Sequence, residues 1–298
     1  MNDHDTDSTG TQPRSLIAGC GDIGLRVAER LTRIGGEGGE VTAIVRTPQK
    51  QAALAAVGAS ALLADLDQPT SVGDWPWLFW FAPPRAQGES DLRLREWLAV
   101  QQGSIERVIY ISTSGVYGDC DGRWIDESEP LKPLATRSIR RADAEAALHD
   151  WCAVRDCTTV ILRVPGIYGP GRLPLARLRA AEPVMRVADA PFSNRVHADD
   201  LADAAILAAR HGHAGAAYNI ADGHPTTMTD YFLQCAKLLG MPAPEQISRS
   251  EAQQRFTPAM WSYMEESKRL RTERARHDLG FVPRYPTLQA GLPGCLPV

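Results

Sequence analysis

The chain has 298 residues, of which 44% are hydrophobic and 23% charged, so it can bury the core of one large domain or of two closely packed ones. Its formal net charge of −4 argues against a general attraction to nucleic acid or to anionic lipid. Residues 1–14 are polar and acidic and lack the apolar segment of a secretory signal, so they predict a disordered tail.

The apolar runs and the cysteines indicate where such a protein works. The most apolar short run, residues 75–82, is far too short to cross a bilayer. The six cysteines form no CxxC pair and no Cys/His cluster with zinc-ligand spacing, so no metal site is expected. In a chain without a leader they are expected to be reduced thiols. These features predict a cytoplasmic protein that needs neither membrane nor metal.

Strand-like and helix-like segments alternate through the first 165 residues. The predicted segments are, in order, a strand at 15–18, a helix at 23–34, a loop at Gly35, Gly36, Gly38 and Gly39, a strand at 41–45, a helix at 49–57, strands at 61–63, 78–81 and 108–111, a helix at 135–155 and a strand at 158–164. The later strands are continuous apolar runs, which is typical of parallel strands covered on both faces. The pattern therefore predicts an α/β fold, a Rossmann-type doubly wound parallel sheet.

The composition of the sequence changes after Pro165, and proline and glycine are frequent from there to residue 191. Residues 199–210 then predict a strong helix, and residues 217–220 are a candidate strand that returns to the sheet. This indicates a dinucleotide-binding core at 15–165, completed by 195–222. Residues 166–194 and 223–298 would form a smaller C-terminal substrate-binding region.

A glycine motif opens the first predicted helix. Gly19, Gly21 and Gly24, with Asp22 and Ile23 between them, form a G-x-G-x-x-G sequence after a strand and before an amphipathic helix. In this context the first glycine permits a tight turn, the second lets backbone approach a pyrophosphate, and the third lets helix and strand pack closely. The helix N-terminus offers free N–H groups to the phosphates. The motif predicts a bound nicotinamide dinucleotide.

The end of the second strand bears on which dinucleotide is bound. NAD-specific folds often place an acid about 20 residues after the glycines, against the ribose 2′-hydroxyl. This chain has no acid there, and Arg46 stands just past the strand instead, with Lys50 nearby. A guanidinium can pair with a 2′-phosphate, so NADP is favoured and NAD is the alternative.

Several further segments resemble the extended short-chain dehydrogenase/reductase family, which includes the nucleotide-sugar epimerases and dehydratases. The matching segments are ADL at 64–66, YISTSGVYG at 110–118, LRVPGIYGPG at 162–171, RVHADDLA at 195–202, YNI at 218–220 and LGF at 279–281. They occur in the family's order and at compatible spacings from Leu16 to Gly291. The resemblance implies that Asp65, followed by Leu66, touches the adenine. It also implies a small-molecule substrate.

The family's catalytic residues are only partly present. The resemblance assigns the family's Ser or Thr to Thr113, four positions before Tyr117, but the Tyr-x-x-x-Lys motif is absent. In the family a Glu commonly lies eight residues after the Tyr, and anchoring on Glu145 places Arg137 at the Tyr position and Arg141 at the Lys position. A guanidinium stays protonated near pH 7, so Arg137 cannot shuttle a proton.

Three interpretations remain open. The chain is an NADP(H)-binding oxidoreductase or epimerase/dehydratase-like enzyme whose acid/base has moved, with Tyr117, Tyr168 and His197 as candidates. Alternatively, it is a non-catalytic NADP(H)-binding sensor or regulatory protein, or a scaffold with a vestigial site. Arg172, Arg195 and His197 are the candidate substrate residues, and the two arginines suit an anionic or sugar-like substrate. A homodimer is expected on general grounds alone.

Overall fold

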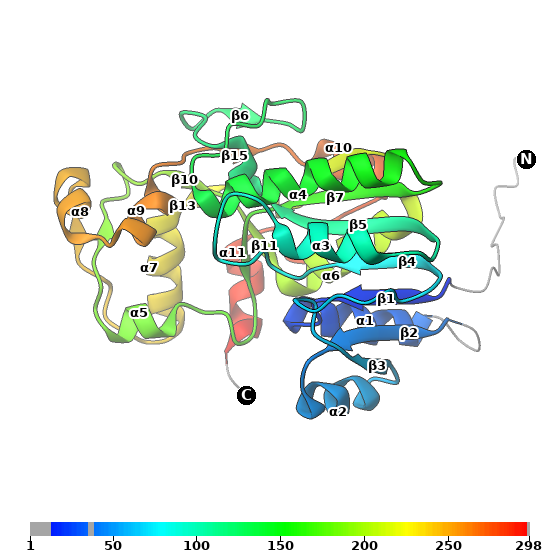
Figure 1. The fold of residues 1–298 in the computed structure, drawn as a ribbon. Coiled ribbons are helices and arrows are strands. Elements are labelled where there is room, and N and C mark those ends of the chain that lie inside the picture. Colours follow the sequence, from blue (N-terminus) through cyan, green and yellow to red (C-terminus); the bar gives the residue numbers. More distant parts are fainter. Residues whose placement is uncertain (1–12, 35–38, 297–298) are drawn as a thin grey trace, which may run out of the picture.

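The chain folds into a large lobe built on a parallel sheet and a smaller lobe beside the carboxyl ends of its strands (Figure 1). The computed structural model describes residues 13–34 and 39–296. The predicted tail lies outside these residues except for its last two positions, as does the predicted loop at Gly35, Gly36 and Gly38. None of the described helices is long and apolar enough to span a bilayer.

Seven parallel strands form the central sheet in the order β12-β7-β5-β4-β1-β2-β3. They are β1 (Ser15–Ala18), β2 (Val41–Val45), β3 (Ser60–Leu63), β4 (Trp75–Trp80), β5 (Ile105–Thr113), β7 (Thr158–Val164) and β12 (Ala216–Asn219). The chain winds outward from β1 to β3 and then crosses to β4 on the other side of β1. This reversal between β1 and β4 is the topological switch point of a doubly wound sheet. The predicted Rossmann-type fold is confirmed.

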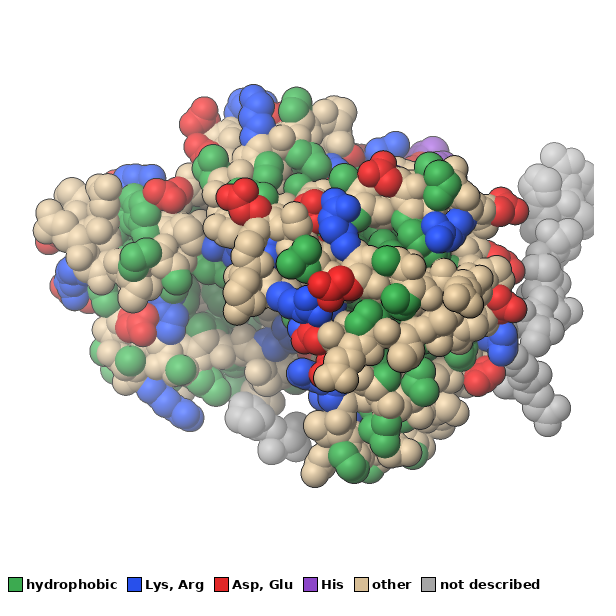
Figure 2. Space-filling view, in the orientation of Figure 1, with side chains coloured by type: hydrophobic (Ala, Val, Ile, Leu, Met, Phe, Trp, Pro, Cys, Tyr) green, Lys and Arg blue, Asp and Glu red, His purple; other side chains and the backbone are tan. Residues whose placement is uncertain are grey.

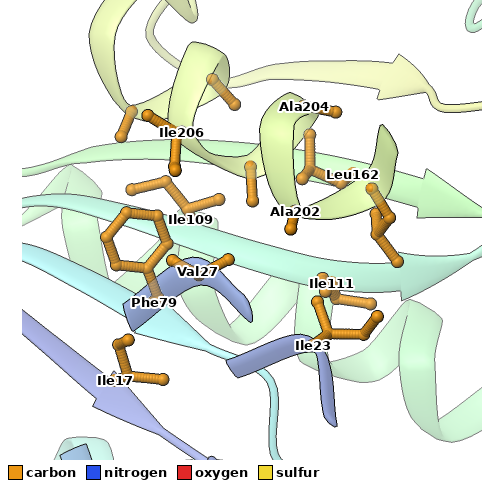
Figure 3. Packing of buried hydrophobic residues seen from close by; sticks show 14 of the residues in the cluster. Ile17, Ile23, Val27, Phe79, Ile109, Ile111, Leu162, Ala202, Ala204 and Ile206 are labelled. Atoms are coloured by element: carbon orange, nitrogen blue, oxygen red, sulfur yellow. The ribbon is translucent and has the colours of Figure 1, made fainter. Parts of the chain in front are cut away.

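Helices cover both faces of the sheet because alternate side chains of each buried strand point to opposite faces. On one face, α1 (Asp22–Ile34), α6 (Ala198–His211) and α10 (Glu273–Leu279) pack over Ile17, Phe79 and Ile109 (Figure 3). On the other face, α3 (Leu92–Val100) and α4 (Thr136–Ala153) pack over Leu16 and Val108. A further helix, α2 (Pro48–Ala56), contacts α1 and β3.

The N-terminus of α6 is capped by His197 and linked to α1 by Asp199. His197 is the N-cap, and its Nδ1 accepts a hydrogen bond from the Asp199 N–H at 3.2 Å. The Asp199 carboxylate instead pairs with Arg26 and Arg30 of α1, each at 2.7 Å. These pairs fasten α6 to the helix that follows the glycine motif.

The smaller lobe is built from short elements, as the sequence after Pro165 predicts. Its elements are β8 (Gly166–Tyr168), α5 (Leu175–Arg179), β9 (Val184–Met185), β10 (Phe192–Ser193), β11 (Arg195–His197), β13 (Thr226–Thr227), α7 (Met228–Leu238), β14 (Gln246–Ile247), α8 (Arg249–Arg255), α9 (Pro258–Met264) and α11 (Leu288–Gly291). A parallel pair, β6 (Trp124–Ile125) with β15 (Arg269–Leu270), ties the loop before α4 to the C-terminal part. The sequence analysis assigned all of residues 223–298 to the smaller region. In the structure, α10 of this segment packs on α6 and β12 of the large lobe.

Candidate cofactor and substrate site

The glycine turn between β1 and α1 has the geometry that its sequence requires. Gly19 has a φ of +87°, and a Cβ there would collide with the backbone of Phe81 and Ala82 after β4. A Cβ on Gly24 would lie 3.2 Å from the Ile17 side chain, so this glycine permits close packing of helix on strand. A Cβ on Gly21 would meet no described atom within 4 Å. The open side of the turn is therefore at Gly21, where a pyrophosphate would lie.

The first turn of α1 is linked to the smaller lobe by an ion pair. Asp22 is exposed, and its carboxylate accepts from Arg26 Nε at 2.9 Å and from Arg172 Nε at 2.6 Å. Ile23, the next residue, is buried in the large core. Arg172 therefore has a carboxylate partner within the protein, although the sequence had placed it among the substrate residues.

The residues expected at the adenosine end lie where β2 and β3 end. Arg46 is exposed and makes no hydrogen bond or ion pair with any residue in 13–34 or 39–296. Lys50 on α2 donates to the Cys20 carbonyl of the glycine turn at 3.2 Å. Asp65 accepts from the Asp67 N–H at 3.0 Å, and Leu66 packs at the edge of the core. Positive charge thus borders the turn, with Arg46 available to a ligand.

An ion-pair cluster beside Asp65 was not predicted. Asp67 accepts from Arg85 Nε at 2.8 Å and from Arg93 Nε at 2.7 Å, and Arg85 also pairs with Glu96 at 2.7 Å. The Arg93 and Arg85 guanidinium groups hold the pKa of the Asp67 carboxyl well below its usual range. The cluster fastens the segment after β4 to the segment after β3.

A cavity of about 400 Å³ lies between the lobes, at the carboxyl ends of β5 and β7. Its walls include Thr113, Arg137, Arg172 and Arg195, so four of the predicted site residues share one cavity. Figure 2 shows the hollow between the lobes, with Lys and Arg side chains on its walls. Tyr117 and His197 do not line this cavity.

The end of β5 directs one of its two hydroxyl residues toward the cavity. Thr113 is half-buried, lines the cavity, and accepts from the Gly115 N–H at 3.2 Å. Its neighbour Ser112 is buried and donates to Glu145 Oε1 at 2.5 Å. Because strand side chains alternate, Thr113 is the β5 hydroxyl residue available to a ligand.

Arg137 and Arg141, the α4 residues at the positions of the family's Tyr and Lys, have different partners. Arg137 lines the cavity and reaches α9, where it donates to the Ser262 hydroxyl at 2.7 Å and lies 3.7 Å from the centre of the Tyr263 ring. Arg141 turns toward the sheet and donates to the Ile111 carbonyl at 2.8 Å and to the Tyr110 hydroxyl at 3.1 Å. Both groups act as donors, and neither can take a proton from a ligand near neutral pH.

Tyr117, one of the relocated acid/base candidates, is enclosed in the protein. It is 1% exposed, and its hydroxyl donates to Asn219 Oδ1 at 2.8 Å and accepts from Arg163 at 3.1 Å. Arg163 in turn forms a buried ion pair with Glu145 at 2.8 Å. Burial raises the pKa of Tyr117 to about 12. Tyr117 therefore organises this network rather than facing the cavity.

The other two candidates are also buried. Tyr168 is 0% exposed, and its hydroxyl donates to the Thr287 carbonyl at 3.3 Å. His197 is 2% exposed, caps α6 and packs between the rings of Tyr168 and Tyr285. Burial raises the pKa of Tyr168 and lowers that of His197. Both side chains hold the joint between the lobes, away from the cavity.

Comparison with known proteins agrees with this architecture. Residues 85–221 match the sequence model of the NAD dependent epimerase/dehydratase family. This part of the chain is similar to that family. The match supports the resemblance to extended short-chain dehydrogenases/reductases.

Two curated relatives match part of the epimerase/dehydratase-like chain. It is 35% identical to the protein YeeZ of Escherichia coli K12, over 47% of this chain and 49% of that protein. It is 26% identical to the dTDP-D-glucose 4,6-dehydratase of Bos taurus, over 63% and 54% respectively. The chain thus spans about half the length of the curated relatives that it matches.

Two solved structures match nearly the whole fold. A conserved protein of unknown function from Silicibacter pomeroyi DSS has a TM-score of 0.78 and 28% identity, covering 95% of this chain and 98% of its own. MoeE5 in complex with UDP-glucose and NAD has a TM-score of 0.74 and 22% identity, covering 95% and 97%. The second likeness shows the shared fold alone.

Three residues of the cavity wall, Asn194, Glu266 and Lys268, were missed by the interpretation of the sequence. Lys268 is 5% exposed, pairs with Glu266 at 2.7 Å and donates to the Gly118 carbonyl at 2.6 Å. Asn194 donates to the Lys268 carbonyl at 3.0 Å and accepts from the Leu270 N–H at 2.9 Å. Lys268 stands in a charged segment without apolar periodicity, so no local pattern indicated that it is buried. Within the described ranges, no three His, Cys, Asp or Glu side chains lie together as a metal site would need.

Proposed function

We propose that this chain binds NADP(H) and uses it on a small molecule held in the cavity, as a cytoplasmic oxidoreductase or epimerase/dehydratase-like enzyme without the Tyr-x-x-x-Lys pair. The proposal rests on one observation. The glycine turn is open at Gly21, and both this turn and the cavity lined by Thr113 lie at the carboxyl edge of the sheet. The family is NAD-dependent by description, and MoeE5 was solved with NAD, which supports a nicotinamide cofactor. Arg46 supports the 2′-phosphate form.

The chain's own residues suggest how the roles are divided. The cofactor, when bound, would supply hydride transfer. The N–H groups at the start of α1 would bind its phosphates, and Asp65 would contact its adenine. Thr113 would orient a carbonyl or hydroxyl oxygen of the substrate. Arg141 would stabilise the end of β5 through its hydrogen bond to the Ile111 carbonyl, and Arg137 would supply positive charge in the cavity.

A second function is favoured by the burial of the acid/base candidates. Tyr117, Tyr168 and His197 are each no more than 2% exposed, and none of them lines the cavity. Such an arrangement suits a non-catalytic NADP(H)-binding sensor that holds a ligand without turnover. The scaffold alternative has less support, because the glycine turn remains open to a ligand.

Replacing Arg46 with Ala should weaken NADPH binding by about 1–3 kcal/mol, the value of a lost charged contact, and leave NADH binding nearly unchanged. The reason is that Arg46 is exposed and has no partner among the described residues, so its removal disturbs no protein contact. Isothermal titration calorimetry of both proteins with both dinucleotides measures the effect. Equal NADPH and NADH affinities in the wild type would remove the assignment of NADP.

Turnover of nucleotide sugars should be weak or absent. The family reactions begin with removal of a hydroxyl proton, and Arg137 offers only donors at the position where the family has a tyrosine. A reduction that draws its proton from water is easier to accommodate than an oxidation that needs a base. The test is a rate assay with nucleotide sugars, and separately with carbonyl compounds and NADPH.

The matched variant in that assay is Arg137→Tyr combined with Arg141→Lys, which rebuilds the missing pair in the register set by Glu145. A gain of turnover in this variant is the expected result. Rapid wild-type epimerase or dehydratase turnover would contradict the proposal, because Arg137 offers no base at the position of the family's tyrosine.

A further inference from the structure

The charges in the cavity wall are not balanced. The charged residues that line it are Arg137, Arg172, Arg195, Glu266 and Lys268. Lys268 is neutralised by Glu266, and Arg172 is neutralised by Asp22. Arg137 and Arg195 have no carboxylate within 4 Å among the described residues, since no ion pair joins either of them to one. The wall therefore carries two guanidinium groups without a counter-charge.

Arg195 is built into the wall rather than left on a surface. It is 6% exposed, lies 4.3 Å above the centre of the Tyr231 ring, and rests on Gly166, where any side chain would collide with its guanidinium. Its protein hydrogen bonds are poor: NH2 approaches the Met228 sulfur at 3.0 Å, and NH1 reaches the Asn194 carbonyl at 3.5 Å. Its Nε is buried and has no partner in the described part of the chain.

Among the described residues, Asp222 is the one carboxyl group with an electrostatic interaction with Arg195, and it forms no ion pair with it. Asp222 is buried, and burial raises its pKa to about 7. A buried guanidinium without a full counter-charge is costly, and native proteins pair such groups or use them on ligands. Arg195 thus needs an anion that the protein itself does not supply.

Arg137 supplies the second positive group from the opposite lobe. Two of its three guanidinium nitrogens donate to Ser262 of α9, and the third, Nε, has no partner within residues 13–34 and 39–296. The cavity of about 400 Å³ is near the lower end of the range for small-molecule sites, roughly 300–1,000 Å³. The space suits a compact ligand.

We propose that Arg137 and Arg195 form a two-point anion site, and that the ligand of this cavity is a small dianion whose two oxyanion groups are carboxylates or phosphates. The proposal rests on the proposed function in assigning the cavity to the ligand. In this proposal Arg137, at the position of the missing tyrosine, binds an anionic group of the ligand and transfers no proton. Arg172 is left out of the site because Asp22 already neutralises it.

The test is a thermal-shift titration of the full chain, at constant ionic strength, with succinate, 3-phosphoglycerate, butyrate and dimethyl succinate. Succinate and 3-phosphoglycerate, which each carry two oxyanion groups, should bind at least tenfold more tightly than the monoanion and the neutral ester. The Arg137→Met and Arg195→Met variants should each weaken dianion binding at least tenfold. Arg172→Met, in the same wall but paired with Asp22, should change it less than threefold. Tighter binding of 3-phosphoglycerate than of succinate would show that one of the two positions prefers a phosphate to a carboxylate.

Calorimetry with NADPH on the same variants separates the two proposals. Dianion binding that depends on Arg137, in a protein that binds no NADPH, would support the anion site and refute the proposed function. NADPH binding with no preference for dianions, or with dianion affinity unchanged by Arg137→Met, would overturn the anion site alone. Because Arg195 is buried, circular dichroism checks that its variant is folded, and Arg137→Met decides the matter if that variant is not.

Discussion

Gly21→Val is expected to abolish measurable dinucleotide binding while the protein keeps its fold. The new side chain would meet no described protein atom within 4 Å, and it would fill the space where the pyrophosphate must approach the backbone. Gly21 is also the residue whose carbonyl accepts the first hydrogen bond of α1, from the Leu25 N–H at 3.0 Å. Replacing a helix N-cap of this kind costs no more than about 1 kcal/mol of stability. Calorimetry with NADPH and a thermal melt measure the two quantities.

The matched control is Gly19→Ala, two residues earlier in the same turn. Here the added Cβ collides with the backbone after β4, and the φ of +87° is unfavourable for any L side chain. This variant should lose stability as well as binding, so the pair separates steric exclusion of a ligand from damage to the turn. Normal NADPH affinity in Gly21→Val would remove the turn from the cofactor site.

Arg163→Met is expected to lower the free energy of unfolding by about 3–5 kcal/mol, the cost of leaving one member of a buried ion pair without its partner. Arg163 NH2 lies 2.8 Å from Glu145 Oε2, and both side chains are less than 10% exposed. The variant would leave a buried carboxylate and would also remove a donor to the Tyr117 hydroxyl. Chemical denaturation monitored by circular dichroism measures the change.

Two further variants show whether burial is the cause. In Arg163→Met combined with Glu145→Leu, no charge is left buried, and much of the lost stability should return. Arg33→Met removes an exposed pair, with Glu29 at 2.7 Å and Arg33 75% exposed, and should cost less than about 0.5 kcal/mol. A loss below 1 kcal/mol in Arg163→Met itself would mean that the pair contributes little to the fold.

The strands could be predicted from the sequence where they are apolar along their whole length. The predicted bounds of β1, β2 and β7 agree with the structure, because these strands are buried on both faces and contain few interruptions. For β5, residues 108–111 were predicted, but the strand extends over Ile105–Thr113. Its ends carry Glu106, Arg107 and Ser112, and polar side chains hide strand residues from a search for apolar runs. The helix α3 was not predicted at all.

In the candidate site, features that depend on neighbouring residues could be predicted, and features that depend on residues far apart in the sequence could not. The glycine turn depends on neighbouring residues, so its geometry could be predicted. The burial of Tyr117 depends on Arg163 and Asn219, which lie 46 and 102 residues further along the chain. The wall formed by Glu266 and Lys268 comes from a segment that has no pattern of its own. Contacts between residues this far apart in the sequence cannot be recognised from motif spacing or composition.

The position of α10 determines how the molecule can be divided. After leaving the sheet at β12, the chain builds most of the smaller lobe and then returns to the large lobe, where Ala275, Leu279 and Phe281 enter the core beside α6. A fragment ending at residue 222 would therefore expose apolar surface on α6 and β12. Neither lobe is a contiguous piece of the chain, so neither can be excised by one cut. Limited proteolysis between the lobes should yield fragments that stay together, and exchange of substrate lobes between relatives would require replacing several segments at once.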